Sequence, residues 1–421
     1  MPTLNKTWTA ISGGQHTEAA DSALRRLRIA LTVFFALDGF LFAGWVVRIP
    51  AVKARTGAST GALGLALLGV SAGAVATMML TGRLCRRFGN HPVTVVSGVA
   101  MSLGIALPPL ARSAPALGLV LLLFGAAYGG INVAMNSAAV DLVAALRRPV
   151  MPSFHAAFSV GGMLGAGLGA LVAGRLSAAR HLWLLTALGL LVSLIAGRAL
   201  LSRPAPRAQA PAAAEPATTE SVPGRRAAAA RPAVPARPAR GGYGLVAVFG
   251  VIALCTAYGE GALADWGALH LQQDLGTGAG VAAAGYSVFA LAMTAGRLGG
   301  SLLLHRLGQT RTLVAGGVTA ALGMLLGSLA PTLWAALAGF VITGLGLANI
   351  FPVAVGRAGE LAGPNGVAAA STLGYGGMLL GPPAIGLLAD HSSLPVALTT
   401  VAGLAALAAA VAWLTRGAGI R

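Results

Sequence analysis

Charged residues are scarce in this chain. Only 10% of its 421 residues are Asp, Glu, Lys or Arg, whereas 56% are hydrophobic, and an ordinary soluble domain carries about 25% charged residues. A soluble protein built from many short helices would need polar helix faces, and the sequence does not supply them. The composition therefore excludes an ordinary soluble domain and favours a membrane protein.

Cysteine is rarer still. Cys85 and Cys255 are the only two, which excludes a disulfide framework and a cysteine-rich metal site. The sequence also lacks a His/Glu zinc motif and a nucleotide-binding Gly-rich loop. We therefore predict a protein that is not an enzyme, has no cofactor or metal and is not an ATP-driven pump.

Acidic residues number 11 against 29 basic ones, which gives a net charge of +18. In a soluble protein such an excess suggests nucleic acid, but in a membrane protein Lys and Arg gather in cytoplasmic loops. With both termini in the cytoplasm, the outer side keeps only Arg48, Lys53, Arg55, Arg112, Arg175 and Arg180. We expect a multi-pass protein of the cytoplasmic (plasma) membrane, with both termini inside and no nucleic-acid partner.

Long apolar segments are what the chain has in abundance. About 20 apolar residues cross a bilayer as a helix. Segments of this kind occupy approximately 29–47, 60–81, 92–110, 116–140, 154–173, 182–201, 244–267, 280–300, 311–330, 333–354, 366–388 and 395–414. The sequence thus predicts an all-α polytopic membrane protein with 12 transmembrane helices.

One polar stretch divides these segments into two sets of six. Residues 203–242 are almost entirely Pro, Ala, Arg, Thr, Ser and Gly, a composition typical of a disordered linker. The linker arginines either touch anionic lipid or belong to an inert tether. The predicted organisation is a cytoplasmic tail over 1–24, a six-helix bundle over 25–202, the linker over 203–242, a second bundle over 243–416 and a tail over 417–421.

The two sets of six echo one another. The fifth span contains Gly161-Gly-Met-Leu164 and the eleventh contains Gly376-Gly-Met-Leu379, and Asp38-Gly39 in the first span matches Glu260-Gly261 in the seventh. Two parallel homologous halves with a substrate site between them near the midplane are a known plan of transporters.

A loop and several span motifs carry a family resemblance. The loop after the second span, Gly82-x-x-x-Arg86-Arg87-x-Gly89, resembles the loop motif of the major facilitator superfamily, with Arg86 where the family has Asp. Within it, the segments 45–50, 130–136, 155–161, 260–266 and 374–383 are similar to the fucose-permease-like branch and its uncharacterised bacterial relatives. The resemblance implies two pseudo-symmetric six-helix bundles that rock about a central site. In the family the loop motif takes part in gating. Asn132 stands where the branch's proton-coupling Glu is expected.

Two carboxylates lie in the middle of predicted spans, Asp38 and Glu260. A charged side chain at the bilayer centre costs about 3 kcal/mol or more, so such residues usually face a bundle interior or a water-filled cavity. We predict that one or both carry the coupled proton. The alternative is a structural carboxylate bonded to a neighbouring helix.

Polar residues at similar depth are candidates for substrate contacts. Asn132 and Asn136 share one helical face. In the second half the candidates for substrate contacts are Asn349, Tyr286 and Tyr375. Interhelical hydrogen bonding or packing is the alternative for each of them.

Arg48, Asp265 and Trp266 are candidates for an outer gate. Asp265 is either a gate residue or a plain interfacial charge, and an interfacial anchor is favoured for Trp266.

The favoured function is secondary active transport of a small polar solute, sugar-like in kind, by alternating access with proton coupling. The alternatives are a proton-driven exporter of a drug or biosynthetic product and a non-transporting membrane receptor or scaffold. The expected partners are the solute, the proton and membrane lipid, and the expected state is a monomer.

Overall fold

The computed structural model describes residues 4–146, 148, 150–202 and 242–417. Over these residues all the regular secondary structure is helical, and 12 segments are long and apolar enough to cross a bilayer. The predicted fold class is confirmed. The predicted linker, apart from Gly242, and the tail beyond Gly417 lie outside the described residues.

The described residues of the first half form seven α-helices. These are α1 (Leu4–Val46), α2 (Ile49–Thr56), α3 (Thr60–Phe88), α4 (Asn90–Gly104), α5 (Ala114–Leu146), α6 (Met151–Ala173) and α7 (Ala178–Leu201), with a 3₁₀ turn, η1, at Pro108–Leu110. The short helix α2 follows the first span and has Pro50 at its start, where a missing N–H costs nothing.

The described residues of the second half form six α-helices. These are α8 (Gly242–Gln273), α9 (Ala279–Leu298), α10 (Gly300–Leu329), α11 (Leu333–Leu347), α12 (Ile350–His391) and α13 (Leu394–Leu414), followed by a 3₁₀ turn, η2, at Thr415–Gly417. Two of these helices contain more than one segment. Gly308 interrupts α10 with a φ of 73°, and α12 includes the end of the tenth span and the whole of the eleventh.

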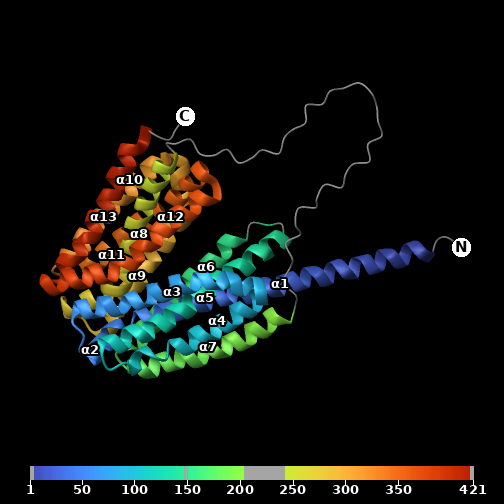
Figure 1. Ribbon diagram of the computed structural model, residues 1–421, viewed down its shortest axis with the longest axis horizontal. Coiled ribbons are helices and arrows are strands. Elements are labelled where there is room, and N and C mark those ends of the chain that lie inside the picture. Colours follow the sequence, from blue (N-terminus) through green and yellow to red (C-terminus); the bar gives the residue numbers. More distant parts are fainter. Residues whose placement is uncertain (1–3, 147, 149, 203–241, 418–421) are drawn as a thin grey trace.

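The helices form two bundles that lean against each other at one end (Figure 1). We call this the α2 end, and we call the opposite end, where α7 finishes and α8 begins, the linker end. The contacts between the halves join α3 to α12, α6 to α9 and α2 to α8.

Small residues bring the halves together at the α2 end. A Cβ on Gly386 of α12 would lie 2.7 Å from the carbonyl oxygen of Thr60, and one on Gly280 of α9 would lie 2.9 Å from that of Ala170. Ala43, Val47, Ala166 and Ala283 form a small apolar cluster across the same boundary. Glycine and alanine allow such close backbone approach between membrane helices.

Candidate functional site

A polar group fills the middle of the first bundle. Asp38 of α1 is 0% exposed, and its Oδ2 accepts a hydrogen bond of 3.1 Å from the side-chain amide of Asn132 on α5. The amide of Asn136 donates in turn to the carbonyl oxygen of Asn132 at 2.7 Å. The second carboxylate oxygen of Asp38 has no partner in the described structure. Burial of a carboxylate with one neutral partner is costly, so this group is poised to bind a further proton or donor.

An ion pair occupies the corresponding depth of the second bundle. Arg297 of α9 donates to Glu260 of α8 with an Nη2–Oε2 distance of 3.3 Å, and its Nε reaches the carbonyl oxygen of Ala348 at 3.4 Å. The two side chains remain 41% and 38% exposed. Both lie inside spans, where a charged side chain usually faces a bundle interior or a water-filled cavity.

Three tyrosines join the two polar groups. Tyr128 of α5 lies within electrostatic range of Asp38 and, across the boundary between the halves, of Tyr286, Tyr375 and Glu260. Its ring also stacks on Phe42, with centroids 5.0 Å apart. We call Asp38, Tyr128, Asn132, Glu260, Tyr286, Arg297 and Tyr375 the central polar cluster. It combines aromatic faces, hydroxyls, amides and a balanced pair of charges, which is a surface suited to a small polar solute.

Sequence reasoning missed Arg297 and Tyr128 as site residues. Arg297 was noticeable in the sequence as a cation inside an apolar span. An intramembrane charge calls for a partner of opposite sign, and Glu260 in the preceding span was the acidic candidate. Nothing in the local pattern around Tyr128 distinguishes it from a packing residue.

Asn349 does not mirror its partner in the first half. Its amide donates to the carbonyl oxygen of Gly296 at 2.9 Å, and its Oδ1 lies against Gly300. Asn349 therefore ties the junction of α11 and α12 to the junction of α9 and α10. Its side chain thus stabilises both of these helix junctions and, among the described contacts, takes no part in a polar pair like that of Asn132 and Asp38.

The candidates at the α2 end do not form a single gate. Arg48 is buried, and it donates from Nε to Nδ1 of His181 at 2.8 Å and from Nη1 to the carbonyl oxygen of Ala173 at 3.3 Å. Burial lowers the pKa of the Arg48 guanidinium from its usual value. Asp265 interacts electrostatically with Tyr286 instead. These hydrogen bonds of Arg48 thus stay within the first half.

The interfacial role expected for Trp266 is wrong. Its side chain is 0% exposed, and a Cβ on Gly386 would lie 3.2 Å from the Trp266 ring. An indole that anchors a helix in the headgroup region must reach lipid. Trp266 instead fills the core where α8 and α12 meet at the α2 end.

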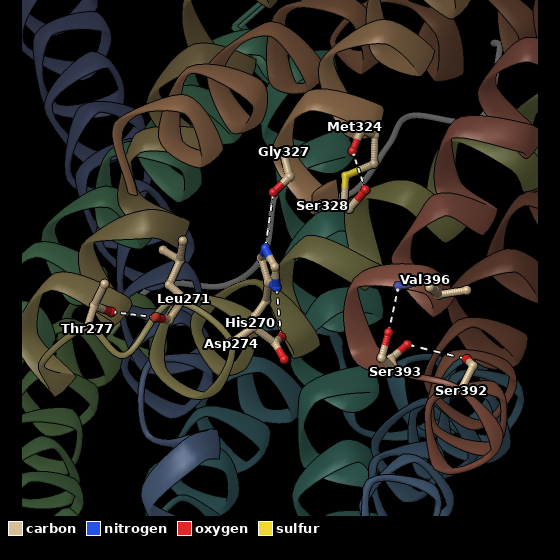
Figure 2. Close-up of polar contacts among 10 residues, drawn as sticks. All are labelled: His270, Leu271, Asp274, Thr277, Met324, Gly327, Ser328, Ser392, Ser393 and Val396. Atoms are coloured by element: carbon tan, nitrogen blue, oxygen red, sulfur yellow. Dashed lines mark hydrogen bonds and ion pairs between the residues drawn. The ribbon is translucent and has the colours of Figure 1, made fainter. Parts of the chain in front are cut away.

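The α2 end of the second half is also tied internally. His270 of α8 contacts Oδ2 of Asp274 at 2.8 Å and the carbonyl oxygen of Gly327 at 3.1 Å, which joins α8 to α10 (Figure 2). Ser393 is the N-cap residue of α13, and its hydroxyl accepts a hydrogen bond from the N–H of Val396. The contact between His270 and Gly327 thus joins two helices of the second half, and the other two bonds are local.

The loop motif lies at the linker end. Gly89, with a φ of 89°, separates α3 from α4, and only glycine adopts this backbone at little cost. Arg87 packs over Phe88, with 5.2 Å between the guanidinium carbon and the ring centroid. Gly82 and Arg86 lie in the last turns of α3.

A carboxylate from another helix meets the residue that follows Gly89. Asn90 donates to Asp141 of α5 at 2.6 Å, and in the second half Gln309, which follows Gly308, donates to Glu360 of α12 at 3.4 Å. Burial and the nearby Asp141 carboxylate raise the pKa of Cys85. The motif therefore contacts carboxylates although its own acidic position is occupied by Arg86.

Comparison with known proteins places the chain in a family. The model of the Major Facilitator Superfamily matches residues 29–308 and 249–419. An uncharacterized MFS-type transporter of Yersinia pestis is 32% identical over 401 residues, which cover 94% of this chain and 97% of that protein. No family of enzymes is implied by these matches, and the chain is a transporter with membrane-spanning helices.

Two solved structures share the fold. The nucleoside transporter NupG superposes with a TM-score of 0.71 at 15% identity, covering 93% of this chain and 99% of NupG. The D-xylose-proton symporter gives 0.69 at 16% identity, covering 92% and 97%. With twelve spans in two bundles, a polar cluster between them and a family model that matches nearly the whole length, this chain belongs to the major facilitator superfamily.

Proposed function

We propose that this transporter imports a small polar solute, of the size and polarity of a sugar or nucleoside, together with protons across the cytoplasmic membrane. The observation that carries the proposal is the central polar cluster, in which both halves supply side chains around two intramembrane carboxylates. A scaffold has no use for such an arrangement, because each buried charge costs stability.

Asp38 and Glu260 have different environments, and we assign them different roles. Asp38 is fully buried without a cationic partner among the described contacts, so we assign the coupled proton to it. Glu260 is paired with Arg297, so its charge is balanced and it presents acceptors to the solute. Asn132 supports the first of these roles, because its side-chain amide donates to Asp38 and to the backbone carbonyl oxygen of Tyr128.

The described conformation supports transport by alternating access. The contacts between the halves gather toward the α2 end, where the first part of α3 meets the last part of α12, the last part of α6 meets the first part of α9, and α2 meets α8. They extend along α3 to Ser71, whose hydroxyl donates to the carbonyl oxygen of Met378 at 3.4 Å. The basic residues predict that the linker end faces the cytoplasm. On this orientation the α2 end, where the halves meet, faces outward, and the linker end, where the two bundles diverge (Figure 1), faces inward. We propose that both termini lie in the cytoplasm and that a monomer suffices.

The relatives support the class of solute without fixing it. One solved neighbour is named as a D-xylose-proton symporter and another as a nucleoside transporter. The resemblance to the fucose-permease-like branch points to the same chemistry.

The test begins with binding. Purified protein is screened by thermal shift against D-xylose, other monosaccharides, nucleosides and cationic drugs, because a ligand that binds only the folded state raises the unfolding temperature. The solute with the largest shift is then used for uptake into proteoliposomes with and without an inward proton gradient. Uptake that follows the gradient and is lost in Asp38→Asn supports the proposal. A shift only with hydrophobic drugs, and efflux driven by the opposite gradient, would instead identify an exporter.

A further inference from the structure

A carboxylate from the second half caps a helix of the first half at the α2 end. Asp390, in the last turn of α12, accepts a hydrogen bond of 2.8 Å from the hydroxyl of Ser59, the N-cap residue of α3. The carboxylate also interacts with the backbone N–H groups of Thr60 and Gly61. The two helices belong to different bundles, so this cap joins the halves.

The contact meets a need of α3. The first N–H groups of a helix lack partners within the helix. The N–H of Ala62 is satisfied by the Ser59 side chain and that of Leu63 by the Ser59 carbonyl oxygen, which leaves those of Thr60 and Gly61. Asp390 approaches both, and its negative charge is favourable at the positive end of the helix dipole. The helix end is complete only while the two halves are together.

Gly61 makes the approach feasible. A Cβ on this residue would lie 2.5 Å from Oδ2 of Asp390 and 3.3 Å from the Leu387 side chain. The first turn of α3 is thus shaped to admit the end of α12.

The pseudo-equivalent contact lacks this feature. There the end of α6 meets the start of α9, and Gly280 packs against the carbonyl oxygen of Ala170. Among the described contacts no carboxylate of α6 reaches that helix start. Of the two helix crossings at the α2 end, the α3–α12 crossing therefore has a carboxylate cap and the α6–α9 crossing, among the described contacts, does not.

We propose that Asp390 is a positioning residue of the transport cycle, which holds the outer side closed by capping α3 from the opposite half. This inference rests on the alternating-access function proposed above. Opening of the α2 end removes the carboxylate and leaves the two N–H groups to water, so the cap favours the inward-open state over the outward-open one.

The test measures the separation of the halves directly, without transport. Spin labels are attached at Ser113→Cys and Gln273→Cys, two exposed positions at the α2 end of the two halves, in a chain with Cys85→Ser and Cys255→Ala. Asp390 is solvent-exposed, so screening keeps the effect modest. Asp390→Ala is expected to lower the ratio of closed to open molecules about three- to tenfold.

Further variants separate the cap from other effects. Ser59→Ala should act in the same direction, and the double variant should be no worse than Asp390→Ala, because coupled residues are not additive. Asp390→Asn should be intermediate, since Asn caps a helix without the charge. Asp274→Ala is the matched control, because this exposed carboxylate at the same end pairs with His270 within its own half.

Two results would overturn the inference. One is a distance distribution in Asp390→Ala equal to that of Asp274→Ala, and the other is strict additivity of Asp390→Ala and Ser59→Ala. If the distance still responds to solute or to a substitution in the α3–α12 crossing, only the cap is refuted. If no variant and no solute changes it, alternating access itself is refuted.

Discussion

The crossing of α3 and α12 provides the sharpest test of the closed α2 end. Gly386 of α12 faces the first turns of α3, where a Cβ would lie 2.7 Å from the carbonyl oxygen of Thr60 and 3.1 Å from the Cα of Gly64. The target atoms belong to the backbone and cannot rotate away. Gly386→Ala therefore has to push the two helices apart.

The size of the effect follows from this geometry. The added methyl group would be about 0.7 Å short of an ordinary contact, which begins near 3.4 Å, and overpacking of a tight core costs about 1–3 kcal/mol. Separation of the halves relieves the contacts with α3, whereas the 3.2 Å approach to the Trp266 ring lies within the second half and remains in both states. The cost of the two backbone contacts therefore falls on the closed state. With the lower part of that range, the ratio of closed to open molecules should fall about 5- to 30-fold.

The assay uses two pairs of spin labels. The pair at Ser113→Cys and Gln273→Cys should lengthen in Gly386→Ala, and a pair at Arg83→Cys and Arg306→Cys, at the linker end, should shorten as the halves rock. The control is Gly403→Ala in α13, where a Cβ would meet nothing within 4 Å. Lengthening of the first pair without shortening of the second would refute the rocking argument, as would equal behaviour of the Gly386 and Gly403 variants.

The polar contacts lead to three further predictions. Asn132→Ala removes the hydrogen bond that the described residues supply to the buried Asp38 carboxyl and should lower the free energy of unfolding by about 1–3 kcal/mol. Chemical denaturation of the double variant with Asp38→Asn should show a loss smaller than the sum of the two single losses, and full additivity would contradict the contact. Arg297→Gln leaves Glu260 without its cation and should reduce solute uptake more than Glu260→Gln plus Arg297→Gln together, which transport kinetics would check; equal losses in both would show that the pair does not act as a unit. His181→Ala leaves the buried Nε of Arg48 without its acceptor and should destabilise the first half by about 1–3 kcal/mol, measured by thermal unfolding, whereas a loss no larger than that of the exposed His391→Ala would contradict the assignment.

Much of the fold could be predicted from the sequence because hydropathy is a local property. Each span needs about 20 apolar residues whatever it packs against, so the twelve segments could be located one by one. The repeated Gly-Gly-Met-Leu segments and the matched positions of Asp38 and Glu260 indicated two related halves in the same way.

The candidate site could be predicted only in part. Asp38, Asn132 and Glu260 stood out because polar groups are rare and costly in a membrane. Their partners did not, because a partner is chosen by the rotation and depth of another helix. Asn132 and Asn349 occupy comparable positions in the repeat, yet one holds a carboxyl group and the other a backbone carbonyl.

The residues at the α2 end show the same limit. Trp266 follows an apolar run and was expected at the lipid interface, but the close approach of α8 and α12 buries it completely. Asp390 is an ordinary residue near the end of a span in sequence terms. It becomes the cap of α3 only because the opposite half is brought against it.

The sequence by itself therefore determined that this protein crosses a membrane twelve times, in two related halves, with carboxylates at mid-depth, since these features depend on the transfer of single segments from water to lipid. The tertiary structure alone decided which polar groups meet, which end is closed and which charge holds it closed. Those properties depend on contacts of a few ångströms between segments far apart in the chain, and no local pattern encodes such distances.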